Sequence, residues 1–93
     1  MIHVMDMGEL VNILLQRCDS SIPWGFNVQG KNQNGYGYVI YVDKVTPGTI
    51  ASNYLKNGDI ILSLSKEHAR DLANKDLDQV IKQAGNCLEL IIT

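Results

Sequence analysis

The chain has 93 residues, a formal net charge of −2 and 45% hydrophobic residues, which fits one globular domain with a modest core. Its basic and acidic residues are interspersed and form no basic stripe, which argues against nucleic-acid binding and membrane-surface binding. Residues 1–9 lack a signal-peptide pattern and no apolar run reaches the roughly 20 residues of a membrane span, so we expect a cytoplasmic domain.

The first third of the chain predicts two strands. We expect residues 1–9 to be a loosely held lead-in and residues 10–93 to form a single domain. Leu10–Gln16 alternates apolar and polar side chains, which predicts a strand with one apolar face formed by Val11, Ile13 and Leu15. After a loop, the same alternation predicts a second strand with Trp24, Phe26 and Val28 on its apolar face.

The middle of the chain predicts further strands separated by turns. Gly30–Gly37 is polar and rich in glycine, which indicates a loop, and Tyr38–Val45 is rich in β-branched and aromatic residues, which predicts a third strand. Thr49–Asn53 fits a short helical turn and Lys56–Asp59 a tight turn. Ile60–Ser65 predicts another strand.

The last third predicts the main helix and a closing strand. Lys66–Asp71 is irregular, with a short strand near Ala69, and Cys87–Thr93 is the last strand. Ala73–Ala84 predicts a helix ended by a C-cap glycine at Gly85, with Leu77, Val80, Ile81 and Ala84 sharing one face. The predicted fold is therefore mostly β with two helices, a partly open barrel or sandwich of five to six strands.

Pro23–Phe26 is the most informative stretch. Gly25 allows the backbone to bend so that successive N–H groups face one concavity, which attracts an anion such as the terminal carboxylate of a peptide. The strand that follows, Phe26–Gln29, could then pair with the peptide. The competing interpretation is that Trp24 and Phe26 are core aromatics at the start of a strand.

Three landmarks follow each other along the chain: Pro23–Phe26, Pro47–Ala51 and Leu55–Leu64, which contains the run NGDIILSL. With the helix and the closing strand, they make residues 10–93 resemble a PDZ domain, and Pro-Trp-Gly-Phe resembles the loop of the ALP/Enigma group of PDZ-LIM proteins. The resemblance implies a monomeric, non-enzymatic scaffold module that binds the free C-terminal tail of a membrane, signalling or cytoskeletal protein. The alternative is a cytoskeletal docking module that recognises an internal segment or a folded partner such as an α-actinin-like protein.

The resemblance also implies which residues would hold the tail. The amides of Trp24, Gly25 and Phe26 would bind the carboxylate, with Trp24 also shaping the pocket rim. Phe26, Val28 and Ile81 would line the pocket for an apolar last side chain.

Five further positions would flank the tail. Asn27 and Gln29 lie along the second strand, Asn74 would be the first residue of the second helix, and Asp78 lies one turn later. Arg17 would help to hold the carboxylate through water. Three of them also have simpler interpretations: Asn74 as a helix N-cap, Asp78 as a solvated charge and Arg17 as a surface cation. The family often has glycine where Lys66 stands, which leaves that turn undetermined.

Nothing in the sequence supports catalysis, a metal or a cofactor. His3 and His68 lack ligand spacing, and Ser20 and Ser21 have no activating motif. Cys18 and Cys87 are expected to be free thiols that serve as small, at least half-buried apolar side chains. If the first and last strands pair, the two thiols become neighbours, and an oxidative link is a minor alternative.

Overall fold

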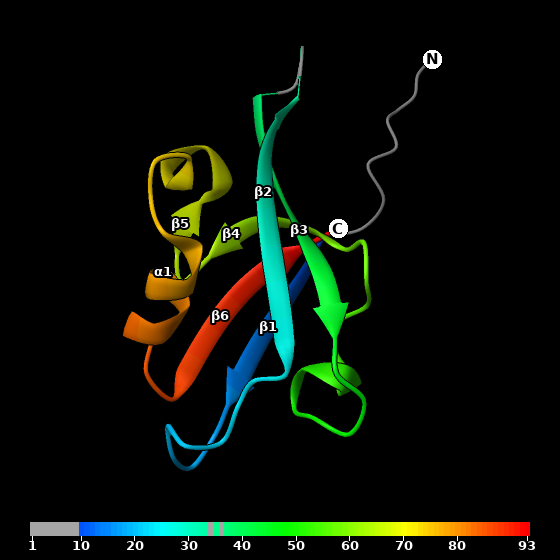
Figure 1. The fold of residues 1–93 in the computed structure, drawn as a ribbon, viewed down its shortest axis with the longest axis vertical. Coiled ribbons are helices and arrows are strands. Elements are labelled where there is room, and N and C mark those ends of the chain that lie inside the picture. Colours follow the sequence, from blue (N-terminus) through cyan, green and yellow to red (C-terminus); the bar gives the residue numbers. More distant parts are fainter. Residues whose placement is uncertain (1–9, 34, 36) are drawn as a thin grey trace.

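The computed structural model describes residues 10–33, 35 and 37–93 (Figure 1), so the predicted lead-in and two positions of the predicted loop, Asn34 and Tyr36, lie outside the described residues. The described chain forms strands, two short 3₁₀ helices (η1 and η2) and one α-helix. In chain order they are β1 (Val11–Gln16), β2 (Phe26–Gln33), β3 (Gly37–Val45), η1 (Ala51–Asn53), β4 (Ile60–Leu64), β5 (Glu67–His68), η2 (Ala69–Leu72), α1 (Leu77–Gln83) and β6 (Cys87–Ile92).

The strands form one antiparallel sheet in the order β1-β6-β4-β3-β2, with β5 paired to β4. β1 and β2 are therefore the two edge strands of this main strand order. The sheet encloses an aliphatic core in which Leu15, Ile40, Ile61, Leu64, Leu72 and Leu88 have no exposed surface. Burying each of these side chains contributes about 1.5–3 kcal/mol, so this cluster is the main stabilising element of the fold.

The predicted strands are largely confirmed, with corrections in β1 and β2. Trp24, predicted on the second strand, lies in the loop before it, because β2 begins at Phe26. Ile13 and Leu15 of β1 are buried, but Val11, on the same face of the strand, is 45% exposed and lies outside the core. The predicted loop at Gly30–Gly37 is wrong in its first half, because β2 continues to Gln33. Residues 30–33 pair with residues 37–40 of β3 and form a long hairpin, which Figure 1 shows extending beyond the rest of the sheet. Polar residues can form such strands because little of the hairpin is buried.

The predicted helix at Ala73–Ala84 is also too long at its start. Asp76 is the N-cap, and its carboxylate accepts hydrogen bonds from the amides of Asp78 and Gln79, so α1 begins at Leu77. Asn74, predicted as the first helical residue or the N-cap, is neither and lies in the turn before α1. The helix end is confirmed, since Gly85 follows the C-cap with φ of +73°.

The remaining short elements lie close to their predicted positions. η1 falls within the predicted turn at Thr49–Asn53, and β5 lies directly before Ala69, where η2 begins. The turn at Lys66 connects β4 to β5 with positive φ at both Ser65 (53°) and Lys66 (71°). Two positive φ values are typical of a type I′ hairpin turn, so Lys66 adopts the conformation that glycine would adopt more easily.

Cys18 and Cys87 are free, but the prediction that they are at least half-buried is wrong, because both are exposed. β1 and β6 pair as predicted, and the residue opposite Cys87 is Gln16. No helix in the described part of the chain is long and apolar enough to cross a membrane. Within the same residues, no three His, Cys, Asp or Glu side chains are grouped as a metal site.

Candidate functional site

The loop before β2 is attached to the rest of the protein through two carbonyl oxygens. The Trp24 oxygen accepts a hydrogen bond from the Ala51 amide (2.9 Å), and the Gly25 oxygen accepts one from the Thr46 amide (2.8 Å). In a trans peptide the N–H of the next residue points opposite to the C=O. The amides of Gly25 and Phe26 therefore point away from the segment that holds the loop, on the outer side of the bend.

These amides are not used inside the described structure. The Gly25 and Trp24 amides donate no hydrogen bond to any other described residue. The Phe26 amide faces away from β3, because the bond between Thr46 and Gly25 makes Phe26 and Val45 a pair without mutual hydrogen bonds. The bend therefore presents consecutive donors, which is the arrangement that binds anions.

Gly25 is required for this bend on two grounds. Its φ is +92°, a region that side chains with a Cβ rarely adopt, and a Cβ at this position would overlap the side chain of Thr49. Thr49 is itself fixed, since its hydroxyl donates to the Thr46 carbonyl (2.7 Å). The loop conformation is therefore determined by a glycine packed closely against a rigid turn.

The outer edge of β2 is free for a further strand. Val42, opposite Val28, uses both of its backbone groups on the β4 side: its amide donates to Asp59 and its carbonyl accepts from Gly58. The N–H and C=O of Val28 must then face the opposite edge, as those of Phe26 do. Among the described strands none pairs with that edge, so it can accept hydrogen bonds from an extended peptide.

Apolar side chains from β2 and α1 lie together beside this edge. Val28 is buried, and Phe26 and Ile81 are half-buried and pack against the core. Figure 1 shows α1 on the flank of the sheet, and α1 contacts β2. Leu77 and Ala84 of α1 are half-buried in the same cluster. The sequence predicts both on the apolar face of the helix, but its pattern does not mark them as site residues.

Arg17 joins three segments around the loop. Its guanidinium group donates to the carbonyls of Ile22 (2.8 Å) and Gly85 (2.9 Å) and to the side-chain oxygen of Asn86 (3.2 Å). Its guanidinium carbon also lies 4.3 Å from the centroid of the Trp24 ring. Three of its N–H groups are therefore engaged in holding the loop, which is a structural role that the sequence did not indicate.

Asp19 orders the first part of the same loop. Its carboxylate accepts hydrogen bonds from the hydroxyl (2.8 Å) and the amide (3.4 Å) of Ser21. These bonds, with a smaller contribution from Arg17, hold the pKa of the Asp19 carboxyl below its usual value. Asp19 is thus ionised at neutral pH and supports the loop rather than acting as an acid.

The other predicted contact residues are exposed. Asn27 and Gln29 point to the opposite face of β2 from Phe26 and Val28. Asp78 lies in the first turn of α1. Asn74 precedes α1 and does not lie on its first turn, so its predicted position at the start of the helix is wrong.

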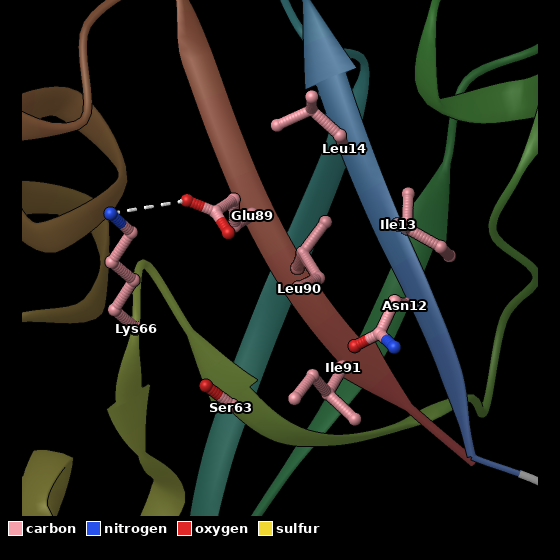
Figure 2. A pocket seen from close by; sticks show the side chains of 8 residues that line it. All are labelled: Asn12, Ile13, Leu14, Ser63, Lys66, Glu89, Leu90 and Ile91. Atoms are coloured by element: carbon pink, nitrogen blue, oxygen red, sulfur yellow. Dashed lines mark ion pairs between the residues drawn. The ribbon is translucent and has the colours of Figure 1, made fainter.

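A pocket of about 260 Å³ lies elsewhere, on the other side of the sheet (Figure 2). Residues of β1, β4, β6 and the turn after β4 line it: Asn12, Ile13, Leu14, Ser63, Lys66, Glu89, Leu90 and Ile91. None of the predicted site residues is among them, and Figure 2 shows the Lys66–Glu89 ion pair at its margin. The loop before β2, the outer edge of β2 and α1 remain the candidate site. The loop and the edge present free backbone hydrogen-bonding groups there, and α1 adds apolar side chains beside them.

The described residues thus form a six-stranded sheet with a helix beside a free edge strand and a glycine bend at the start of that strand. The PDZ domain family matches residues 12–93, and the chain belongs to that family. PDZ domains are interaction modules and are not a family of enzymes.

Solved structures with the same fold include the following two. A structure of INAD PDZ3 in complex with a TRP channel tail shows a TM-score of 0.70 at 17% identity and covers 89% of this chain and 84% of its own. Dlg1 PDZ2 from the choanoflagellate Monosiga brevicollis shows a TM-score of 0.73 at 20% identity and covers 90% of this chain and 97% of its own. No curated protein matches the chain.

Proposed function

We propose that this PDZ domain binds the free C-terminal tail of a partner protein, which adds as a strand to the outer edge of β2 beside α1. The observation that carries the proposal is the orientation of the loop before β2. Its carbonyls at Trp24 and Gly25 are bound inward, and the amides of Gly25 and Phe26 consequently point outward. Two backbone donors at a rigid bend suit a carboxylate, which accepts several hydrogen bonds at once.

Strand addition supplies the second part of the interaction. The free N–H and C=O of Val28 and the C=O of Phe26 would pair with the tail, and alternate tail side chains would point toward α1. The last side chain would then lie among Phe26, Val28 and Ile81, which favours an apolar residue at the end of the tail. Asn27, Gln29 and Asp78 are exposed beside this path and would contact residues further from the tail end.

Arg17 has a supporting part in this proposal. Because three of its N–H groups already bind Ile22, Gly85 and Asn86, its main effect would be to hold the loop in shape. Any contribution to the carboxylate through water would use the remaining N–H groups. The affinity for a short tail should be roughly micromolar, since such a peptide buries little area and loses chain entropy on binding.

The test uses an array of C-terminal peptides that vary in their last residues. The tightest binder is then prepared in three forms: with a free carboxylate, with a C-terminal amide, and with one extra residue after the former end. We expect calorimetry to show at least tenfold weaker binding of the amide and the extended form, because neither can place a terminal carboxylate at the loop.

Equal binding of all three forms would contradict the proposal. That result would favour the alternative mode, in which the domain docks an internal segment or a folded cytoskeletal partner. The tail of a TRP channel is a suitable first probe, because INAD PDZ3 was solved in complex with one.

A further inference from the structure

β1 forms the end of the sheet opposite to β2, and its outer edge is paired with no described strand. Edge strands in soluble proteins are usually protected by lysine, proline, a bulge or short length. β1 has none of these: its sequence is VNILLQ, without charge or proline, and it pairs with β6 in unbroken register over six residues. Its flank is apolar, with Leu10 61%, Val11 45% and Leu14 50% exposed.

The hydrogen-bond pattern identifies which residues face that edge. The Arg17 amide donates to the Asn86 carbonyl, which continues the register in which Gln16 lies opposite Cys87. Because backbone direction alternates along a strand, the odd-numbered residues of β1 bond to β6. The N–H and C=O groups of Asn12, Leu14 and Gln16 therefore point outward, and their side chains lie on the exposed face.

This edge is complementary to itself in one register. If two copies of β1 pair antiparallel around a two-fold axis at Leu14, the leucine meets its own counterpart and Asn12 lies opposite Gln16 of the other copy. All outward N–H and C=O groups of these three residues are then paired, and the amide side chains can hydrogen-bond across the seam. A shift by two residues would place Leu14 against an amide side chain instead.

The absence of charged residues in β1 favours a second copy of the domain as the partner that pairs with this edge. The strand is uncharged, so self-pairing brings no like charges together at the seam. Among the described residues, Glu89 lies opposite Leu14 on β6 and is therefore one strand further in on each copy, where its carboxylate pairs with the Lys66 ammonium group at 3.5 Å. An edge without charges would offer less to a strongly charged partner.

We propose that the domain self-associates through β1, in an isologous antiparallel pair with its two-fold axis at Leu14. Two six-residue strands bury less than the roughly 1,000 Å² of a stable interface, so the dimer should be weak, with a dissociation constant on the order of 100 µM. This adds a concentration-dependent state to the monomeric domain expected from the sequence. Since β2 lies at the other end of the sheet, both peptide sites would stay open, and a dimer would present two of them.

The first test is sedimentation velocity of the full chain from about 10 µM to about 1 mM. We expect the weight-average sedimentation coefficient to rise with concentration, and Leu14→Lys to abolish the rise. Tyr54→Lys is the matched control, because Tyr54 is 55% exposed but lies after η1, away from β1. No rise in the unmodified chain, or equal suppression of the rise by both variants, would overturn the proposal.

The second test locates the axis by oxidation of single-cysteine variants made in a chain with Cys18→Ser and Cys87→Ser. Leu14→Cys should form a covalent dimer rapidly, because residues opposite each other in a hydrogen-bonded pair have Cα atoms about 5.5 Å apart, within disulfide range. Asn12→Cys should not, because its counterpart would lie about 14 Å away across the axis. Equal cross-linking of both variants, or none, would exclude this register and overturn the proposal. Peptide binding by each variant serves as the folding control.

Discussion

Arg17 stacks on the indole ring of Trp24 while its guanidinium group holds the carbonyls of Ile22 and Gly85. One side chain at the end of β1 thus connects the loop before β2 with the C-terminal end of α1. These are the two sides of the candidate peptide site. The spacing between them therefore depends on a residue that need not contact the peptide.

Arg17→Ala should destabilise the fold by about 2 kcal/mol, because it removes both the cation–π interaction and the hydrogen bonds of the guanidinium group. Arg17→Lys should recover only a small part, because an ammonium group cannot reproduce the planar set of donors. Chemical denaturation measures both. Lys31→Ala is the control, because it also removes a cation next to an aromatic ring, but an exposed one: the Lys31 Nζ lies 5.6 Å from the centroid of the Tyr41 ring. This variant should change the free energy of unfolding by less than about 0.5 kcal/mol.

Tail affinity gives an independent measure of the Arg17 role. If it only positions the loop, Arg17→Ala should weaken binding slightly at temperatures where the variant is folded. A decrease in tail affinity larger than about tenfold in the folded variant would instead show that Arg17 contacts the carboxylate directly.

Gly25 and Gly48 form a matched pair for testing the bend. Both have positive φ, +92° and +81°, but a Cβ on Gly25 would overlap Thr49, whereas a Cβ on Gly48 would meet nothing within 4 Å. Gly48→Ala should cost about 1 kcal/mol for backbone strain alone, and Gly25→Ala about 3 kcal/mol or more because of the added overlap. Thermal unfolding compares them. Similar destabilisation by the two variants would mean that Thr49 moves aside and that the bend is less rigid than described.

Most of the sheet could be predicted from the sequence because most strands contribute buried apolar side chains to the core. Ile60–Ser65 and Cys87–Thr93 are runs of β-branched and aliphatic residues bounded by turn residues, and they match β4 and β6 closely. The extension of β2 to Gln33 could not be predicted, because Gly30–Gln33 carries no apolar pattern. Its strand conformation depends on pairing with β3, which is a contact between segments.

The geometry of the candidate site could be predicted to a similar extent. Gly25 could be assigned because the bend needs a residue without a Cβ, and the structure shows that requirement directly. The start of α1 could not, because Asn74 and Asp76 are both good N-cap residues. Which of them caps the helix depends on side-chain geometry, and Asp76 has the two amides within reach. The contact between Arg17 and Trp24 crosses a loop and leaves no local pattern.

The turn between β4 and β5 offers a stabilising change. Ser65 and Lys66 both have positive φ, a conformation that costs a residue with a side chain roughly 1 kcal/mol. Lys66→Gly should therefore raise the free energy of unfolding by about 1 kcal/mol, less any contribution from the exposed Lys66–Glu89 pair. Glu89→Gln removes that ion pair without changing the turn, so its effect on the free energy of unfolding measures the contribution of the pair that has to be subtracted. A decrease in stability for Lys66→Gly that exceeds the Glu89→Gln effect would contradict the strain argument.

Ile81 provides the most direct test of the apolar part of the site. It is half-buried on α1 beside the β2 edge, so Ile81→Asp would place a carboxylate where the last side chain of the tail should pack. We expect tail binding to fall by at least tenfold, because the tail would either have to desolvate the new charge or leave its last side chain unpacked. Gln83→Asp is the control: it adds the same charge to the exposed part of the same helix. It should change binding by less than threefold. Fluorescence anisotropy with a labelled tail measures both variants, and circular dichroism confirms that each is folded. If both variants bind like the unmodified domain, the tail does not lie along α1.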